Sequence, residues 1–383
     1  MPYIRLFNPE NDIMLQWPAE RTISLVHTLS PNVEALRRAG AMLPVWWSSP
    51  GDAVIVHDDD SLYSRKWLDE MSALFPFLSN MSIASTADAG KPGAPWGWSG
   101  DAARRLSRAG AECPSIAQLE RMRMLSHRCT SLMVMEYLKQ NSTIPLPLLP
   151  TEATTVEEVQ LAVESSPNGF YIKSPWSSSG RGVVRFDTLS EKAIQRICGM
   201  IRRQGSVMVE QALDGIQDFA MLYHIADGKA QWKGYSLFFN SHSSYSGNLL
   251  CDDATIEHRL VSAGADRKTL IAIRHCVANA LSEIIGRDYT GWLGVDMLLD
   301  RDGMIAPCIE VNLRMTMGVV AHFLAERILA PDTEAVYSVE PHSPREKNNS
   351  PTIVDGRLIA GELMLTPPGG AFDFKISVTE RNR

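Results

Sequence analysis

The sequence predicts a protein of the α/β (α+β) class, in which a small lobe with a parallel sheet precedes units built from hairpins. Strands alternate with helices over residues 1–115, which is the pattern of a parallel sheet covered by helices. A strand–loop–strand unit spans Phe170–Val184, and apolar strands at Gly291–Leu299 and Ile305–Leu313 are joined by a short turn. Short turns join antiparallel strands, so we expect both kinds of sheet.

Composition limits the classes of function. The chain has 383 residues, which suits two or three packed lobes. Hydrophobic residues make up 45% and charged residues 21%, as in ordinary globular proteins. A formal net charge of −7 argues against nucleic-acid binding through bulk charge. The apolar runs are too short to span a bilayer, so we expect neither a nucleic acid nor a membrane as partner.

The cysteines and the first residues indicate a cytoplasmic protein. Six cysteines are scattered along the chain, and no close pair has the spacing of a metal site or a redox motif. Reduced thiols in a core are typical of the cytoplasm. Residues Met1–Asn8 form a short strand-like run without the basic and apolar regions of a signal peptide.

The first lobe is expected to begin with a strand at Tyr3–Phe7 that runs into the polar turn Asn8–Asp12. Asn and Asp beside Pro usually shape a turn or cap a helix, which is the favoured interpretation. A turn after the first strand of an α/β lobe can also face a ligand. The aspartates at 58–60 are interpreted as a solvated turn rather than a metal site. The other expected elements are helices at 31–38, 67–77 and 98–109, a strand at Ala53–His57, and a Gly/Pro-rich loop at 87–97 beside Trp98.

The rest of the chain is expected to alternate helices with hairpins, including one at Asp227-Gly228, a strong hairpin turn. A Ser/Gly/Asn-rich loop at Asn240–Asn248 carries His242 and Tyr245, and it is either a lid over a substrate or a mobile loop. Residues 331–352 are predicted to be a linker because Pro, Ser, Asn and charge dominate them. We expect helices at 116–125, 129–139, 151–165, 190–203, 267–285 and 318–329, strands at 207–210, 219–226 and 231–239, and a last hairpin of 357–366 with 372–378.

A lysine at the end of a strand faces a loop of small residues. Lys173 ends the strand Phe170–Lys173, and the loop Ser177–Gly182 follows it. An ammonium beside serine hydroxyls and glycine N–H groups is suited to polyphosphate. The loop is not a Walker A motif, because the lysine precedes the glycines. A plain hairpin with a surface lysine explains these residues equally well.

The hairpin of residues 291–313 carries a second set of polar groups. Glu310 and Asn312 point to one face because side chains alternate along a strand, and the turn brings Asp296 to a comparable height. Two carboxylates and an amide oxygen are a ligand set that suits Mg²⁺. The alternative is a solvated hairpin face, but such a face would tolerate Lys, Thr or Gln, so the metal site is favoured.

With both sets stated, the order of the motifs resembles the ATP-grasp superfamily, which includes D-alanine–D-alanine ligase, biotin carboxylase and the amidoligases. The resemblance covers about residues 115–325 and implies the ATP-grasp fold. It also implies a division into a preceding α/β domain at 1–115, an ATP-grasp domain at 116–330 and a linker with a C-terminal hairpin at 331–383. Within the second domain it implies a helical linker, a nucleotide lid at 151–210 and a metal-binding hairpin at 291–313.

The resemblance also implies roles for particular residues. Arg128 stands in Ser126-His127-Arg128, where the family often has a phosphate-binding lysine. Lys233 would reach the γ-phosphate, or it is a surface lysine. Asp218 resembles the acid that binds the ribose, with Asp214 as an alternative. The remaining roles fall to Lys173 and to Ser177, Ser178, Ser179, Gly180, Arg181 and Gly182 for phosphates, to Glu210 and Gln211 for adenine, to Asp296, Glu310 and Asn312 for one or two Mg²⁺ ions, and to Arg314 for the transferring charge.

The implied activity is that of an ATP- and Mg²⁺-dependent ligase. It would activate a small-molecule or peptide carboxylate as an acyl phosphate and join it to an amine or a thiol. A kinase that phosphorylates a small molecule, and a protein that binds ATP without turnover, are the alternatives. A homodimer is compatible with the resemblance. If the first lobe supplies contacts to a substrate, as the resemblance implies, Asn8–Asp12 and Trp96–Ser99 are the segments at which to look for them, although a structural role is favoured for both.

Overall fold

The structure is a computed structural model that describes residues 1–24, 29–164, 169–177, 182–241, 244–343 and 350–379, without the side chains of 240, 241, 244 and 245. The predicted loop residues Ser178, Ser179, Gly180 and Arg181, together with His242 and the side chains of Asn240 and Tyr245, lie outside this description. Among the described residues, no helix is long and apolar enough to cross a membrane. All six cysteines are free thiols.

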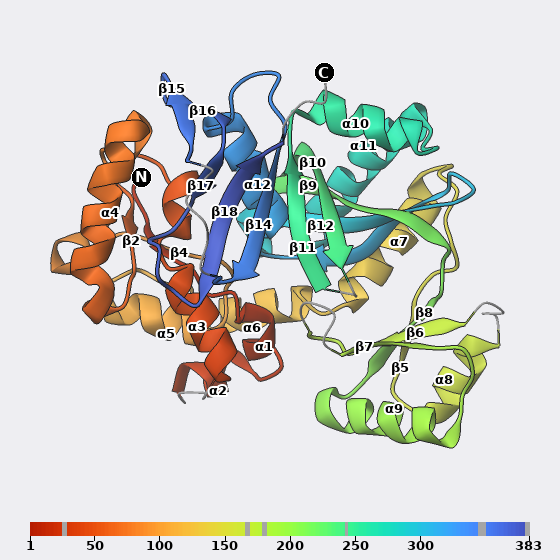
Figure 1. Ribbon diagram of the computed structural model, residues 1–383. Helices are drawn as coiled ribbons and strands as arrows, with labels where there is room; N and C mark the ends of the chain where they lie inside the picture. Colours follow the sequence, from red (N-terminus) through yellow and green to blue (C-terminus); the bar gives the residue numbers. More distant parts are fainter. Residues whose placement is uncertain (25–28, 165–168, 178–181, 242–243, 344–349, 380–383) are drawn as a thin grey trace.

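The first lobe contains the predicted small parallel sheet, with strand order β3-β2-β1-β4 (Figure 1). The strands on either side of β1 are β2 and β4, so the chain after β1 and the chain after β4 leave the sheet at neighbouring positions. Residues Asp58–Asp60 form a short 3₁₀ helix, and Asp60 forms an ion pair with Arg38 of α3, which agrees with the solvated turn expected there. The elements are β1 Ile4–Leu6, α1 Asn11–Met14, α2 Ala19–Ser24, α3 Pro31–Ala39, β2 Ala53–Val54, α4 Ser61–Leu74, β3 Ser82–Ile83, β4 Gly93–Pro95 and α5 Gly100–Arg108.

A large sheet of eight strands forms the centre of the molecule, in the order β13-β12-β9-β10-β11-β14-β18-β17 (Figure 1). Alternate residues of β9 and β12 pack with α7, α10 and α11 in one core, while the opposite face packs with α12 and the first lobe. Asp227 and Gly228 both have positive φ at the predicted hairpin turn. The elements are α6 Ile116–Leu125, α7 Cys129–Asn141, β9 Gly215–Ala226, β10 Lys229–Ser241, β11 Ser244–Leu250, α10 Asp253–Ser262, α11 Arg267–Ile284, β12 Gly291–Asp300, β13 Ile305–Asn312 and α12 Met317–Arg327.

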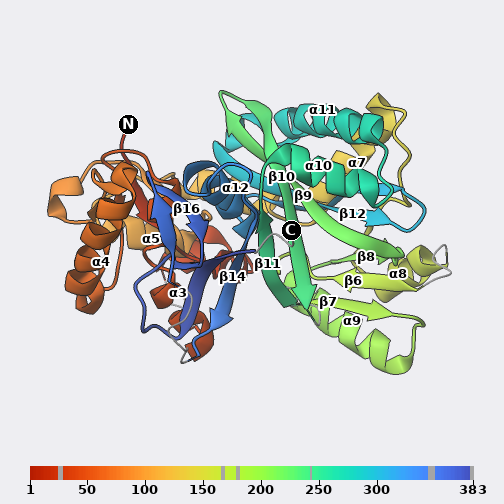
Figure 2. The ribbon, with the colours of Figure 1, turned by 45° about the horizontal axis from the view of Figure 1, so that its top comes forward.

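A separate sheet with the order β5-β8-β6-β7 lies beside the large sheet, with α8 and α9 against it (Figures 1 and 2). We call this unit the lid. The helix expected from residue 151 begins only at Val156, because Thr155 and Glu158 form a capping box there and the residues before it form β5. The elements are β5 Thr151–Ala153, α8 Val156–Val163, β6 Phe170–Lys173, β7 Val183–Phe186, α9 Glu191–Gln204 and β8 Val207–Gln211.

The prediction of a linker at residues 331–352 is wrong for its first half, because residues 335–341 form β14 inside the large sheet. The side chains of Ala335 and Tyr337 are completely buried, and this alternation was hidden by the polar composition of the flanking residues. Of the expected last hairpin, β17 pairs with β18, but residues 357–360 pair with β15 instead. The elements are β14 Ala335–Pro341, β15 Thr352–Val354, β16 Arg357–Ala360, β17 Glu362–Met364 and β18 Phe372–Val378.

Candidate active site

The hairpin β12–β13 brings the three predicted metal ligands together. Asp296 lies opposite Glu310 in the strand register, and Gly294 lies opposite Asn312, so all three polar side chains share one face. Asn312 Nδ2 donates a hydrogen bond to Asp296 Oδ2 at 3.0 Å. The neighbouring residue Val295 points into the core on the other face. The trio is therefore formed by local strand geometry, with Asn312 buried and the two carboxylates half-buried.

The electrostatics of the trio favour a bound cation. Burial is the main cause that raises the pKa of Asp296 to about 7, and the charge of Glu310 raises it further. The hydrogen bond from Asn312 and the nearby arginines Arg314 and Arg128 oppose this shift without cancelling it. The groups of the protein therefore compensate the negative charge of the Asp296 carboxylate only in part. Two carboxylates and one amide oxygen are hard ligands of the kind that Mg²⁺ takes, so the residues present fit the ion.

Arg314 follows β13 directly and connects the trio to the first lobe. Its Nη2 donates to Asn312 Oδ1 at 2.9 Å. Its Nε and Nη2 also donate to the carboxylate of Asp12, at 2.9 and 2.7 Å. Asp12 lies in α1, in the turn after the first strand, and Asn11 and Asp12 line a narrow cleft with Ser177 and Arg314. The last two residues of this turn, Asn11 and Asp12, therefore lie at a cleft, which supports the interpretation that the turn faces a ligand.

The sequence analysis included Asp12 only as part of the turn Asn8–Asp12 and did not predict its contact with Arg314. A signal for it existed, because polar residues after the first strand of a parallel sheet often lie at a ligand crevice. Earlier residues of the same turn have structural roles instead. Asn8 Nδ2 donates to the carbonyl of Gly97 at 2.9 Å, and the buried Glu10 pairs with Arg105 at 2.9 Å. The two loops at which to look for substrate contacts, 8–12 and 96–99, are therefore neighbours.

On the lid, Lys173 is buried and forms an ion pair with Glu210. The two residues lie on neighbouring strands, because Tyr171 of β6 is opposite Glu210 of β8. Gln211, the other predicted adenine contact, lies opposite Phe170. The two ends of the described loop are joined, since Ser174 N donates to the carbonyl of Gly182 at 2.8 Å.

Arg128 joins the lid to the hairpin. Its Nη1 lies 2.9 Å from Glu310 Oε2, while its Nε donates to the carbonyl of Ser174 at 3.1 Å and its Nη2 to Ser177 Oγ at 3.2 Å. Ser174 follows Lys173 directly. The buried Arg128 side chain therefore brings the lysine end of β6 and the acidic face of β13 to the same cleft.

A buried thiol reports the same convergence. Burial is the main cause that raises the pKa of Cys308 to about 12, and three nearby carboxylates contribute to this shift. These carboxylates are Glu210 from the lid and Asp296 and Glu310 from the hairpin. Because Coulomb effects decay with distance, the lid and the hairpin present their acidic groups to one region.

The remaining predicted residues separate into two groups. Asp218 of β9 lies opposite Leu298 of β12. It is two positions from Ala220, which lies opposite Asp296, so the Asp218 side chain is on the same face of the sheet as the trio. The alternative, Asp214, pairs with Arg301 at the surface, where both side chains are 72% exposed. Lys233 lies at a bulge of β10 and donates to Gln231 Oε1 at 3.1 Å. Gln231 lies further from the trio along β10 than Lys233 does, so the Lys233 side chain points away from the trio, as a surface lysine would.

His127, Cys129 and Glu152 are residue types that often bind metals, and their ligand atoms lie within 4.8 Å of one another. However, His127 Nδ1 accepts a hydrogen bond from the backbone N–H of Cys129 at 3.0 Å. In a neutral histidine the other nitrogen then carries the proton, which points it at Glu152 as a donor rather than as a metal ligand. This group therefore supports the chain on either side of Arg128.

Comparisons with known proteins agree with this geometry at the level of the fold. No family model matches the sequence, and no curated protein matches it. The structure is similar to a biotin carboxylase from Campylobacter jejuni in a β-γ-ATP complex, with 11% identity, a TM-score of 0.57, and coverage of 99% of this chain and 88% of that chain.

It is also similar to the biotin carboxylase domain of the 2-oxoglutarate carboxylase from Hydrogenobacter thermophilus, in complex with MgADP, ADP and bicarbonate. That match has 12% identity, a TM-score of 0.50, and coverage of 99% of this chain and 86% of that chain. At such low sequence identities, the similarity supports the fold and not the activity. The chain has the ATP-grasp fold, as its sequence motifs implied.

Proposed function

We propose that the chain is an ATP- and Mg²⁺-dependent ligase, which activates a carboxylate as an acyl phosphate and joins it to an amine or a thiol. The observation that carries the proposal is the contact of Arg128 with both Glu310 and the residues that follow Lys173. Through it, a lysine-bearing lid, a set of oxygen ligands and Arg314 share one cleft. The similar structures were solved with adenine nucleotides, which supports the nucleotide part of the proposal.

In this function the protein positions the reactants and neutralises charge. Lys173 and Arg128 would hold phosphate oxygens, Glu210 and Gln211 the adenine, and Asp218 the ribose. Asp296, Glu310 and Asn312 would hold Mg²⁺, which supplies charge neutralisation at the β- and γ-phosphates. Without a nucleotide, Arg128 forms an ion pair with Glu310, and Lys173 forms an ion pair with Glu210. Phosphate oxygens would replace these carboxylates as partners of both cations.

The chemistry proceeds in two steps. A carboxylate oxygen of the substrate forms a bond to the γ-phosphorus while the bond to the β–γ bridging oxygen breaks, and ADP leaves. The amine then forms a bond to the acyl carbon and loses a proton, and inorganic phosphate leaves with the electron pair of the broken C–O bond. Arg314, held by Asp12 and Asn312, lies where it can stabilise the negative charge that develops in both steps.

The test is a screen for ADP release with pooled amino acids, peptides and other carboxylates in the presence of Mg²⁺. A ligase will release ADP and inorganic phosphate only when a carboxylate and an acceptor are both present. Asp296→Asn should abolish the signal. A product phosphorylated on a hydroxyl would instead identify a kinase. ATP binding that survives both Asp296→Asn and Glu310→Gln, without turnover on any pool, would identify a binding protein.

The proposal extends to assembly and location. We expect a homodimer in the cytoplasm, because one similar structure is of a biotin carboxylase domain dimer and because all six thiols are free. Light scattering of the purified chain should give about twice the mass of 42.4 kDa. A monomer at micromolar concentration would contradict the dimer without affecting the ligase proposal.

A further inference from the structure

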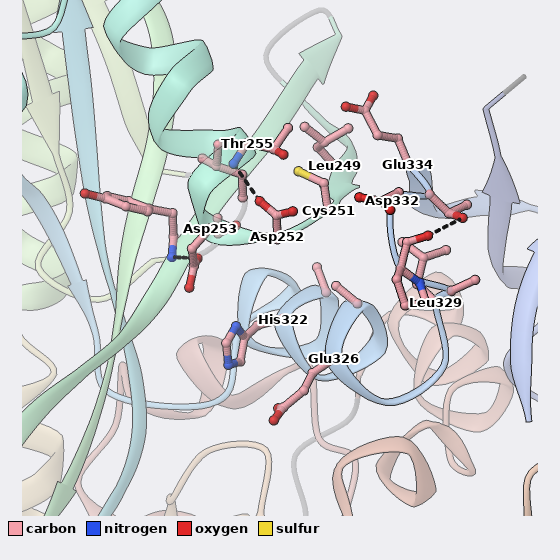
Figure 3. A pocket seen from close by; sticks show the side chains of 18 of the residues that line it. Leu249, Cys251, Asp252, Asp253, Thr255, His322, Glu326, Leu329, Asp332 and Glu334 are labelled. Atoms are coloured by element: carbon pink, nitrogen blue, oxygen red, sulfur yellow. Dashed lines mark hydrogen bonds between the residues drawn. The ribbon is translucent and has the colours of Figure 1, made fainter. Parts of the chain in front are cut away.

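A cavity of about 610 Å³ lies away from the candidate active site, at the place where β10 and β11 diverge (Figure 3). The two strands pair only through residues 238–241 of β10, so the preceding part of β10 and the end of β11 separate. The start of α10, the outer face of α12 and residues 329–334 close the space between them. Its volume is in the range of small-molecule sites. No member of the metal trio lines it.

Two polar side chains converge at the inner end of this cavity. Asp253, on the first turn of α10, accepts a hydrogen bond from the backbone N–H of Tyr235 through Oδ1 at 2.7 Å. His322 faces it from α12 (Figure 3). A Cβ added to Gly234 would lie 2.9 Å from Asp253 Oδ1 and 2.9 Å from His322 Nδ1. The absence of a side chain at 234 therefore lets both groups approach the backbone at this position.

The charge of the wall is negative. Asp252 and Asp253 face the space in Figure 3, the exposed Glu326 also belongs to the lining, and Glu334 is already paired with Arg259 at 2.6 Å. The arginine in the lining, Arg357, donates to the backbone carbonyl of Glu326 at 2.6 Å. Burial is the main cause that raises the pKa of Asp253, so its charge is incompletely compensated. A cation would compensate it.

The rest of the lining is apolar. Its side chains are contributed by β11, α10, α12 and the segment that follows α12, so a hydrocarbon chain could lie against them while a charged head reaches the inner end. The apolar residues are Leu249, Ile256, Ala321, Ala325 and Leu329. A site with one polar end and an apolar wall selects a ligand with one charged group and a short apolar body.

We propose that this cavity is a binding site for a primary alkylamine, whose ammonium group is held between Asp253 and His322 and whose chain packs on the apolar wall. The ammonium would donate to the carboxylate of Asp253 and to a ring nitrogen of His322. The site is separate from the cleft of the proposed ligase, and it does not depend on that function.

The test is calorimetric titration of the full chain with n-butylamine, with 1-butanol as a neutral ligand of similar shape. The wild-type chain should bind one butylamine and bind butanol at least tenfold more weakly. Asp253→Asn removes the charge but keeps an acceptor for Tyr235 N–H, and it should weaken butylamine at least tenfold. Gly234→Ala places a methyl group between the two anchors and should have a similar effect. Asp302→Asn, at an exposed turn, is the matched control and should bind as the wild type does.

Absence of binding to the wild type at millimolar butylamine would overturn the proposal. Equal affinities of the wild type and Asp253→Asn would overturn it as well. Thermal unfolding of each variant identifies loss of fold, and His322→Phe provides a third variant if Gly234→Ala is unfolded. ATP binding, measured on the same samples, reports the other cleft, so failure of one site is distinguishable from failure of the other.

Discussion

At the scale of single residues, Arg314 is the side chain on which turnover should depend most. Among the described residues, it donates hydrogen bonds to Asn312 of the trio and to Asp12 of the first lobe. Arg314→Ala should lower kcat by about 100- to 1000-fold, as loss of a charge-stabilising donor does in other enzymes, with less than a tenfold change in the Kd for MgATP. ADP release and calorimetric titration measure the two quantities.

Arg301→Ala is the matched control for this prediction. Arg301 also pairs with an aspartate, Asp214, and follows β12, the strand that pairs with β13, but the Arg301–Asp214 pair is exposed to solvent. Its removal should leave kcat unchanged within twofold. An Arg314→Ala variant with the kcat of the wild type would remove Arg314 from the mechanism.

The pKa of Asp296 predicts how metal binding depends on pH. Burial and Glu310 raise this pKa to about 7 from 3.8, and Mg²⁺ binds the ionised form. Below pH 7 a proton must leave before the metal binds, so the affinity for MgADP should fall by up to tenfold per pH unit. The stability of the metal-free protein should depend on pH in the opposite direction, because the folded state binds the Asp296 proton more tightly than the unfolded state does. This group should therefore lower the free energy of unfolding as the pH rises from about 4 to about 7.

Calorimetric titration with MgADP between pH 5.5 and 8.5 measures this dependence. Asp296→Asn is the control, because it keeps the titration of the nucleotide phosphates and removes that of the carboxyl group. Its affinity should be low throughout, and its profile should be flatter than that of the wild type. Parallel profiles would show that Asp296 does not titrate in this range.

At the scale of elements, the close packing of α12 on β10 holds the segment that follows Arg314. Gly318 lies in the first turn of α12, and a Cβ there would lie 2.7 Å from Ser236 Cβ. Gly318→Ala should lower the free energy of unfolding by about 1–3 kcal/mol, because the added methyl group forces the helix from the sheet. Urea unfolding followed by circular dichroism measures the change.

Gly199→Ala is the comparison for this prediction. Gly199 lies inside α9 of the lid, where the nearest atom to an added Cβ is the flexible end of Arg203 at 3.8 Å. Alanine should stabilise this helix by about 0.5–1 kcal/mol. Equal effects of the two substitutions would mean that contact with Ser236 does not determine the outcome.

At the scale of the whole molecule, the first lobe and the last strands share one core. The indole of Trp46 is fully buried and donates to the carbonyl of Leu365 at 2.7 Å, and the rings of Phe7 and Phe374 are 5.8 Å apart. A separate core of the lid contains only residues between Ala153 and Val209. The three-part division predicted from the sequence therefore stays a prediction, and it can be tested by dissection.

A fragment of residues 1–115 lacks the chain segments that complete its core, so it should unfold without a cooperative thermal transition. A fragment of residues 150–213 contains the whole lid core and should unfold cooperatively. Circular dichroism of both fragments and of the full chain provides the measurement. A cooperative transition in fragment 1–115 would contradict the shared core and support an independent first domain.

The sequence by itself determined the features that depend on neighbours along the chain. The alternation of polar and apolar residues in 291–313 was sufficient to place Asp296, Glu310 and Asn312 on one face, because strand register is local and the turn between them is short. The Asp227-Gly228 turn and the helix at 267–284 followed from local preferences in the same way.

Only the tertiary structure decided which distant segments meet. Asp12 and Arg314 are 302 positions apart, and Arg128 precedes α7 whereas its partner Glu310 lies on β13, so no local pattern encodes either contact. The same holds for β14, whose polar flanks concealed a strand that is stable because two other strands pair with it. Burial and pairing of remote strands outweigh local composition, since they remove far more apolar surface from water than a single segment can.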